Sequence, residues 1–117
     1  MSLNVFLEKI ANNTPVSFAE TIAVISENYH YQPTEFSNGL HDQVLTSAAG
    51  ANEGSCKIFA FAKIHQLNVQ QTLNLFGDYY RVDVLNDATG DSHQNIRQFM
   101  KFGWDGISFT GQALQQK

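Results

Sequence analysis

The chain has 117 residues and a mass of 13.1 kDa, which fits one domain spanning residues 1–117. Apolar residues make up 43% of the chain and its formal charge is -4, so it can form a packed core and has no net attraction to phosphate backbones or anionic lipids. A single cysteine excludes an intrachain disulfide and is typical of a reducing compartment. We therefore expect an acidic, cytoplasmic protein, a monomer or weak dimer, that binds neither nucleic acid nor membrane.

Two amphipathic helices are predicted near the N-terminus. Apolar residues three and four positions apart predict a first helix over about residues 3–12, with Ser2 as its cap. Ser17 and Glu20 have the spacing of a capping box, and apolar residues follow them at helical intervals. A second helix is therefore predicted over residues 17–29.

The segment that follows is predicted to be mostly irregular. Residues 29–36 include two tyrosines and Pro33, which suits an extended edge segment because proline has no amide to donate to a neighbouring strand. After an Asn-Gly turn, a short helical piece is expected at about residues 41–46, and a loop of small residues at 47–54.

Three further helices are predicted in the second half of the chain. Residues 52–65 are apolar on almost every side, as expected of a helix packed between other elements. A second capping spacing, Asn-x-x-Gln, opens a helix over residues 68–80, and Ser92 is placed to cap a last helix that ends at about 103–104. Residues 107–109 alternate in polarity, which indicates a strand.

These elements predict a predominantly helical α+β domain with four to five helices and one short two-stranded pairing, between residues 29–36 and 107–109. Its core is expected to centre on the large apolar residues of the last three helices and the turn after them. These residues are Phe59, Phe61, Ile64, Leu73, Phe76, Ile96, Phe99, Met100 and Trp104.

Polar residues gather at two predicted helix starts, residues 52–57 and 93–97. A helix start exposes backbone amides and the positive end of the dipole, which favour an anion. We predict a cleft between these starts, with residues 79–81 close by. Its predicted ligand-binding residues are Asn52, Glu53, Ser55, Lys57, Tyr79, Tyr80, Arg81, Asn95 and Arg97. The simpler interpretation is that Asn52, Ser55 and Ser92 only cap helices and that Arg81 pairs with a nearby aspartate.

Cys56 and His93 suggest a catalytic use of the same cleft. Cys56 is predicted in the first turn of a helix beside a lysine, two influences that promote the thiolate. His93, at the start of another helix, could serve as a base. The competing interpretation is that a lone cysteine is a small buried hydrophobe and that His93 is a cap or core residue.

No motif predicts a metal site or a cofactor. The glycines of residues 50–57 do not have P-loop spacing, and the four histidines show no paired ligand spacing. Asp83, Asp87 and Asp91 do not match a calcium-binding EF-hand loop, because Gln98 stands where its final glutamate is required.

Three blocks of the sequence together resemble the HopJ type III effector family. They are residues 52–63, residues 76–81 with 83–85, and residues 93–100 with 103–104. The similarity extends from the first predicted helix to about Leu114, and the loop 87–91 is its least typical part. The resemblance implies a virulence protein that plant pathogens inject into host cells through a type III secretion system. It brings no established reaction and no assigned catalytic residues.

Two functional hypotheses follow. In the first, the chain is a small interaction domain that recognises an unknown protein or a small anionic ligand in the predicted cleft. In the second, it is a small cysteine-dependent enzyme with Cys56 as nucleophile and His93 as base, in which Asn52, Ser55 or Arg97 orients the substrate.

Overall fold

The computed structural model describes residues 1–117. Five α-helices carry most of the regular structure: α1 (Leu3–Ala11), α2 (Phe18–Asn28), α3 (Glu53–Ile64), α4 (Val69–Asn74) and α5 (Gln94–Phe102). A π-helix, η1 (Tyr79–Val84), follows α4, and a 3-10 helix, η2 (Gly103–Gly106), follows α5. The predicted helix-rich α+β class is therefore confirmed.

Five short strands form two antiparallel sheets. β1 (Tyr29–Tyr31) pairs with β5 (Leu114–Gln116) in one of them. β2 (Phe36–Asn38) lies between β3 (Leu45–Ser47) and β4 (Ile107–Phe109) in the other. The strand at 107–109 is confirmed, but it pairs only with the end of the expected partner segment, and the single predicted pairing is replaced by two sheets.

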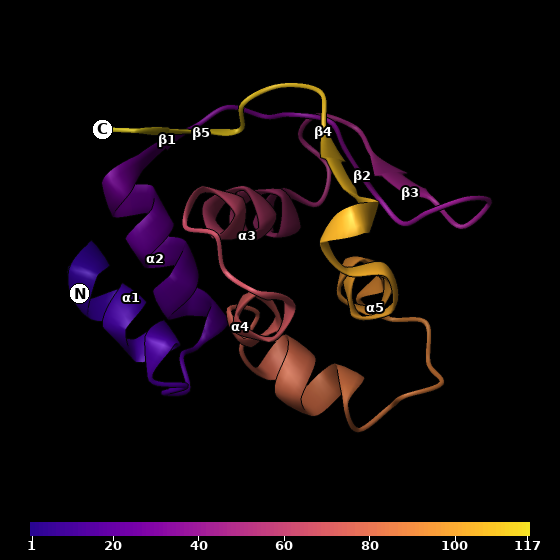
Figure 1. Ribbon diagram of the computed structural model, residues 1–117, viewed down its shortest axis with the longest axis horizontal. Coiled ribbons are helices and arrows are strands. Elements are labelled where there is room, and N and C mark those ends of the chain that lie inside the picture. The colour runs from indigo at the N-terminus through magenta and orange to yellow at the C-terminus, as the bar shows by residue number, and fades with distance from the viewer.

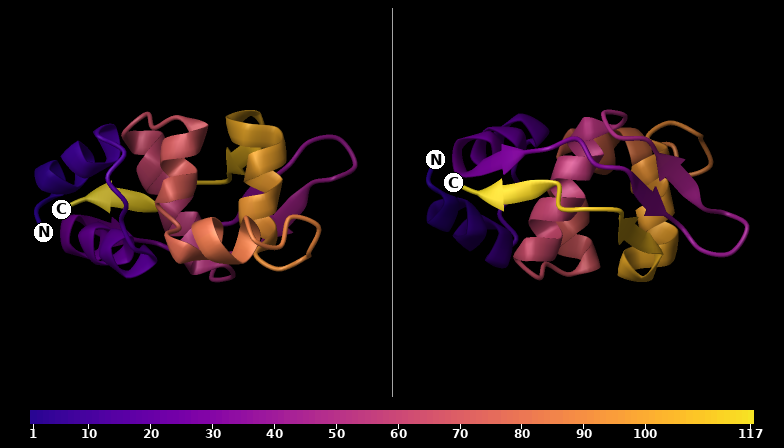
Figure 2. Two further views of the ribbon diagram at one scale, coloured as in Figure 1. Left: turned by 90° about the horizontal axis from the view of Figure 1, so that it is seen from below. Right: turned by 90° about the horizontal axis from the view of Figure 1, so that it is seen from above.

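α3 occupies the centre of the molecule, where Figure 1 shows it end-on. α1 and α2 lie on one side of it, α5 lies on the other, and the strands cross one face. Both termini lie at the end of the molecule formed by α1 and α2, as the views in Figure 2 also show. A helix surrounded in this way must be apolar on nearly all sides, which explains the composition of residues 52–65.

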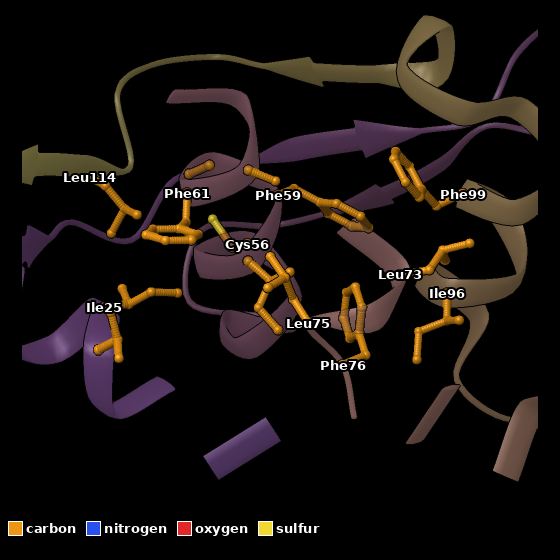
Figure 3. Packing of buried hydrophobic residues seen from close by; sticks show 14 of the residues in the cluster. Ile25, Cys56, Phe59, Phe61, Leu73, Leu75, Phe76, Ile96, Phe99 and Leu114 are labelled. Atoms are coloured by element: carbon orange, nitrogen blue, oxygen red, sulfur yellow. The ribbon is translucent and has the colours of Figure 1, made fainter. Parts of the chain in front are cut away.

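The core is built around the aromatic side chains of α3. The Phe59 ring lies 5.0 Å from that of Phe99, 5.6 Å from Phe76 and 6.0 Å from Phe36, measured between ring centroids. Phe61 is likewise fully buried and packs edge-on against Phe6. Figure 3 shows the side chains of α3 meeting those of α2, α4 and α5 in one continuous cluster.

Two residues expected in the core are at the surface. Ile64 is 48% exposed and Met100 is 43% exposed, because each lies on the outer side of its helix. Trp104 packs against the core from its edge, and its indole N–H donates a hydrogen bond to the Leu67 carbonyl oxygen at 2.9 Å.

The predicted side-chain caps of three helices, α1, α2 and α4, are confirmed. Ser2 caps α1, Ser17 and Glu20 form a capping box on α2, and Asn68 does the same with Gln71 on α4. Each of these bonds spans three residues and depends only on local geometry.

Three local predictions were wrong. Residues 41–46 are not helical, since His41 adopts a positive φ of 59° and β3 begins at Leu45. The fourth helix ends at Asn74 rather than near residue 80, because Gly77 has φ +61° and breaks the helical path before η1. Ser92 does not cap α5: the N-cap residue is His93, whose side chain makes no capping bond.

Candidate functional site

A cavity of about 560 Å³ lies where the starts of α3 and α5 meet. This volume is within the range of small-molecule sites in proteins. No carboxylate and no lysine or arginine lines it. Its lining residues are Phe18, Leu45, Asn52, Gly54, Ser55, Phe76, Tyr79, His93, Gln94, Asn95 and Ile96.

The start of α3 forms one side of this cavity and is uncapped. Asn52 adopts the left-handed conformation, with φ 51° and ψ 46°, and makes no side-chain capping bond. Its side-chain amide instead donates to the Ser47 hydroxyl at 2.9 Å. The first amides of a helix have no intrahelical acceptor, so those of Glu53, Gly54 and Ser55 remain available.

The start of α5 forms the other side and has the same construction. His93 has φ 51° and ψ 54°, and it too leaves the helix start without a side-chain cap. The Ser92 hydroxyl accepts a hydrogen bond from Arg97 Nη2 at 3.2 Å instead of capping the helix. The interpretation of Asn52, Ser55 and Ser92 as simple caps is therefore wrong, and two uncapped helix starts border one cavity.

Asn95 contributes a side-chain donor to the cavity. It is only 6% exposed and lines the cavity wall. Asn38 Nδ2 lies 2.9 Å from the Asn95 backbone oxygen and 3.1 Å from Asn95 Oδ1. A backbone oxygen can only accept, so the Asn38 atom next to it must be the nitrogen, and the Asn95 atom that receives the second bond must be the oxygen. The Asn95 NH₂ group is thereby left without a protein acceptor.

An aromatic wall completes the cavity. The Tyr79 ring lies 5.0 Å from the His93 ring, tilted by 32°, and 4.9 Å from the Phe18 ring in an edge-to-face contact. Asp83 Oδ2 lies 3.1 Å from His93 Nε2 and orients the imidazole. Tyr79 and Asp83 both belong to η1, so the π-helix supplies both groups that hold His93.

Two glycines allow the start of α2 to approach this wall. A Cβ atom on Gly54 would lie 2.9 Å from the Phe18 ring, and one on Gly77 would lie 2.6 Å from the Phe18 backbone nitrogen. Only residues without a side chain permit such contacts. Phe18 can therefore pack against α3 and Tyr79 together.

Five of the predicted site residues line this cavity: Asn52, Ser55, Tyr79, His93 and Asn95. The other predicted residues do not line the cavity. Glu53 is exposed, and Lys57 Nζ lies 4.7 Å above the Tyr31 ring. Tyr80 is buried, with its hydroxyl 3.4 Å from Gln70 Nε2.

The two predicted arginines organise loops rather than the cavity. Arg81 Nη2 donates to the Val16 backbone oxygen at 2.7 Å, and it also lies 3.8 Å from the Asp78 carboxylate. Arg97 Nη1 donates to the Asp87 backbone oxygen at 2.7 Å and so holds the loop that precedes α5. These bonds occupy donors that the sequence alone assigned to a ligand.

Cys56 lies in the core and not in the cavity. Its side chain is fully buried, and its thiol donates to the Thr34 carbonyl oxygen at 3.5 Å. Figure 3 shows the sulfur among the side chains of Phe59, Phe61 and Leu75. Burial raises the pKa of the Cys56 thiol, which opposes the thiolate that a nucleophile requires. His93 lines the cavity whereas Cys56 does not, so the structure does not support the Cys56–His93 pair.

Sequence reasoning missed several residues of this site. Asn38 was interpreted only as part of a turn, although its contact with Asn95 orients the cavity donor. The separation of 57 residues between the two leaves no local signal. Asp83 could have been linked to Tyr79 by their four-residue spacing in a helical segment. Nothing local indicated that either would meet His93.

Metal binding and membrane insertion require features of other kinds. No three His, Cys, Asp or Glu side chains converge closely enough to hold a metal ion. None of the helices combines the length and the apolar character that crossing a membrane requires.

Comparison with known proteins places this architecture in a family. The family model described as HopJ type III effector protein matches residues 3–114. The protein VPA0580, whose crystal structure is described as that of a protein of unknown function, is 43% identical to this chain and superposes with a TM-score of 0.94. That similarity covers 100% of this chain and 95% of VPA0580. No curated protein matches. Because the family model spans almost the whole sequence, the chain belongs to the HopJ type III effector family.

Proposed function

We propose that this HopJ family protein binds a small molecule through a carboxylate or phosphate group, in the cavity between the starts of α3 and α5. The observation that carries the proposal is the Asn95 NH₂ group, which has no protein acceptor and belongs to a residue that is 6% exposed and lines the cavity. A donor at a cavity wall that has no protein acceptor is free to find its partner in a molecule that enters the cavity. A ligand oxygen would supply that partner.

The rest of the cavity lining supports the same ligand chemistry. Two uncapped helix starts point backbone amides and positive dipole ends toward one space. Although the chain carries eleven acidic residues, none of them lines this cavity. The net charge of -4 therefore acts at long range, whereas the ligand would meet only donors and neutral groups at close range.

An NMR titration tests this proposal directly. Inorganic phosphate or acetate, added to ¹⁵N-labelled protein, should shift the amide signals of Gly54, Ser55, Gln94 and Asn95 in a saturable way. The variant Asn95→Asp retains an acceptor oxygen for Asn38 but replaces the free NH₂ group by a second carboxylate oxygen, so it should abolish binding.

The matched control is Asn86→Asp, which makes the same change in net charge at an exposed residue away from the cavity. It should bind both anions as the unmodified chain does. Binding that survives in Asn95→Asp, or signals that move equally all over the surface, would contradict the proposal.

The Asp83–His93 contact favours a second candidate function, acid–base catalysis at the same cavity. A carboxylate bonded to one imidazole nitrogen fixes the ring and leaves the other nitrogen to exchange a proton with a bound molecule. This candidate replaces the cysteine-dependent mechanism. It requires turnover of a bound molecule that His93→Gln abolishes while binding persists, whereas equal turnover in that variant would exclude it.

Export through a type III secretion system is a further proposal, supported by membership of the family. The first helix contributes Phe6 and Ile10 to the core, so its release for export would require unfolding of the domain. Fusion of the chain to a reporter should give translocation in a strain with a working type III apparatus and none in a strain without it. Retention in both strains would favour a protein that acts in the cytoplasm.

A further inference from the structure

We infer that the ligand of the cavity between α3 and α5 is a flat aromatic or heteroaromatic acid whose ring packs against Tyr79. This inference rests on the proposed function, because the acidic group is the part that the helix starts and Asn95 would bind. It adds the chemical nature of the rest of the molecule.

The exposure of Tyr79 is the first observation. The chain has fourteen aromatic residues, nine Phe, four Tyr and one Trp, and Tyr79 is the only one in the exposed class, with 43% of its surface accessible. Tyr79 also lines the cavity. The most exposed aromatic residue of the chain therefore stands at the cavity that holds the free donors.

The second observation is that the Tyr79 ring is held in place without a ligand. Phe18 contacts it edge-on on one side and His93 lies against it on another, with Asp83 orienting His93 in turn. The ring is therefore already ordered before binding, which lowers the entropy cost of packing a ligand against it. A π-helix, a rare element that often marks functional sites, carries both Tyr79 and Asp83.

The third observation is the size of the cavity and the composition of its lining. Phe18, Leu45, Phe76 and Ile96 line it in addition to the donors of the helix starts. Its volume of about 560 Å³ is far larger than a bare acetate or phosphate fills, given that one water occupies about 30 Å³. The site thus matches a molecule that combines an acidic group with an apolar, planar part.

Three carboxylates of graded structure test the inference: acetate, cyclohexanecarboxylate and benzoate. All are ionised near pH 7, and the last two have similar size, so their difference reports on the flat ring. Benzoate should bind about 2- to 10-fold more tightly than cyclohexanecarboxylate, the range expected from one aromatic contact beyond area burial. Affinities are measured from the amide shifts of Gly54 and Asn95.

Variants of Tyr79 test whether its ring causes the preference for benzoate. Tyr79→Leu should remove the preference for benzoate and retain binding of acetate, and Tyr79→Phe should keep the preference. Unfolding curves of both variants establish that they are folded before binding is compared. Met100→Leu, at an exposed residue outside this cavity, serves as the control and should leave all three affinities unchanged.

The outcomes separate this inference from the proposed function. Equal binding of benzoate and cyclohexanecarboxylate, with acetate still bound, would overturn the aromatic ligand and leave the anion site standing. A benzoate preference that persists in folded Tyr79→Leu would also overturn it. If neither acetate, phosphate nor benzoate shifts the cavity amides, both the inference and the proposed function are wrong.

Discussion

The side chain of Asn38, in β2, determines which way the side chain of Asn95, in α5, faces the cavity. Asn38 Nδ2 donates both to the backbone oxygen and to the side-chain oxygen of Asn95, at 2.9 and 3.1 Å. The NH₂ group of Asn95 is consequently the part left for a ligand. Asn38 is buried and does not itself line the cavity, yet it determines that Asn95 presents a hydrogen-bond donor there.

Replacement of Asn38 by alanine should therefore affect both stability and binding. Asn38→Ala removes two buried hydrogen bonds to α5, and we expect the free energy of unfolding to fall by about 1–3 kcal/mol, measured by urea denaturation. Anion binding should weaken because Asn95 loses its fixed orientation. Ser37→Ala, the neighbouring residue on the half-exposed face of β2, should change stability by less than about 0.5 kcal/mol. A similar effect of both variants would refute this role of Asn38.

The central position of α3 predicts a large cost for truncating its aromatic side chains. Phe61 is fully buried and contacts the rings of Phe6 and Tyr29, so Phe61→Ala should lower the free energy of unfolding by about 3–5 kcal/mol. Met100→Ala, at the surface of α5, should cost less than about 1 kcal/mol. Thermal and denaturant unfolding both measure this difference, and a loss below about 1 kcal/mol for Phe61→Ala would mean that the core is placed wrongly.

Gly77 and Gly50 represent two different reasons why a position requires glycine. Both have positive φ, +61° and +89°, but an added Cβ would lie 2.6 Å from the Phe18 nitrogen at Gly77 and meets nothing within 4 Å at Gly50. Gly50→Ala should cost only the conformational strain, about 1–2 kcal/mol. Gly77→Ala should cost clearly more in chemical denaturation, because the start of α2 must move away. Equal losses would show that the close approach of α2 contributes nothing.

The buried position of Cys56 predicts an unreactive thiol. Iodoacetamide at pH 8 should modify the folded protein at least about 100-fold more slowly than the same protein in denaturing urea, because the thiol is reached only when the structure opens. Mass spectrometry follows the reaction. Burial also raises the pKa of Cys56, so little thiolate forms at neutral pH. Comparable rates in the folded and unfolded protein would restore the cysteine-dependent mechanism.

His65 predicts that the fold is less stable in mild acid. Tyr29 and His65 share a hydrogen bond of 2.6 Å, and burial lowers the pKa of His65 below its ordinary value of 6.5. The unfolded chain then binds a proton more readily than the folded one, so the stabilising contribution is full above pH 6.5 and is lost as the pH falls through the folded pKa. Urea unfolding at pH 7 and pH 5 should show this loss. His65→Gln should show a smaller change between the two, and an unchanged difference would exclude His65 as its source.

Local sequence patterns were sufficient to predict the positions of most of the helices. The capping bonds of α1, α2 and α4 span only three residues, and the apolar face of each helix repeats at intervals that need no partner to recognise. The starts of α3 and α5 were located to within about two residues although the caps predicted for them are wrong, and their polar residues led to the assignment of Asn52, Ser55, His93 and Asn95 to a common site. The blocks that resemble the HopJ family were also readable in the chain itself.

Tertiary structure alone decided the chemistry of that site. Whether Cys56 is a reactive or a buried thiol depends on which elements surround α3, and desolvation by the core raises the pKa of Cys56 despite the nearby Lys57. Arg81 and Arg97 bind backbone oxygens of other segments, while Asn38 reaches across 57 residues to orient Asn95. Strand pairing and side-chain packing of this kind bring together residues that are distant in the chain. The energies of these contacts depend on the folded arrangement, so no local sequence pattern predicts them.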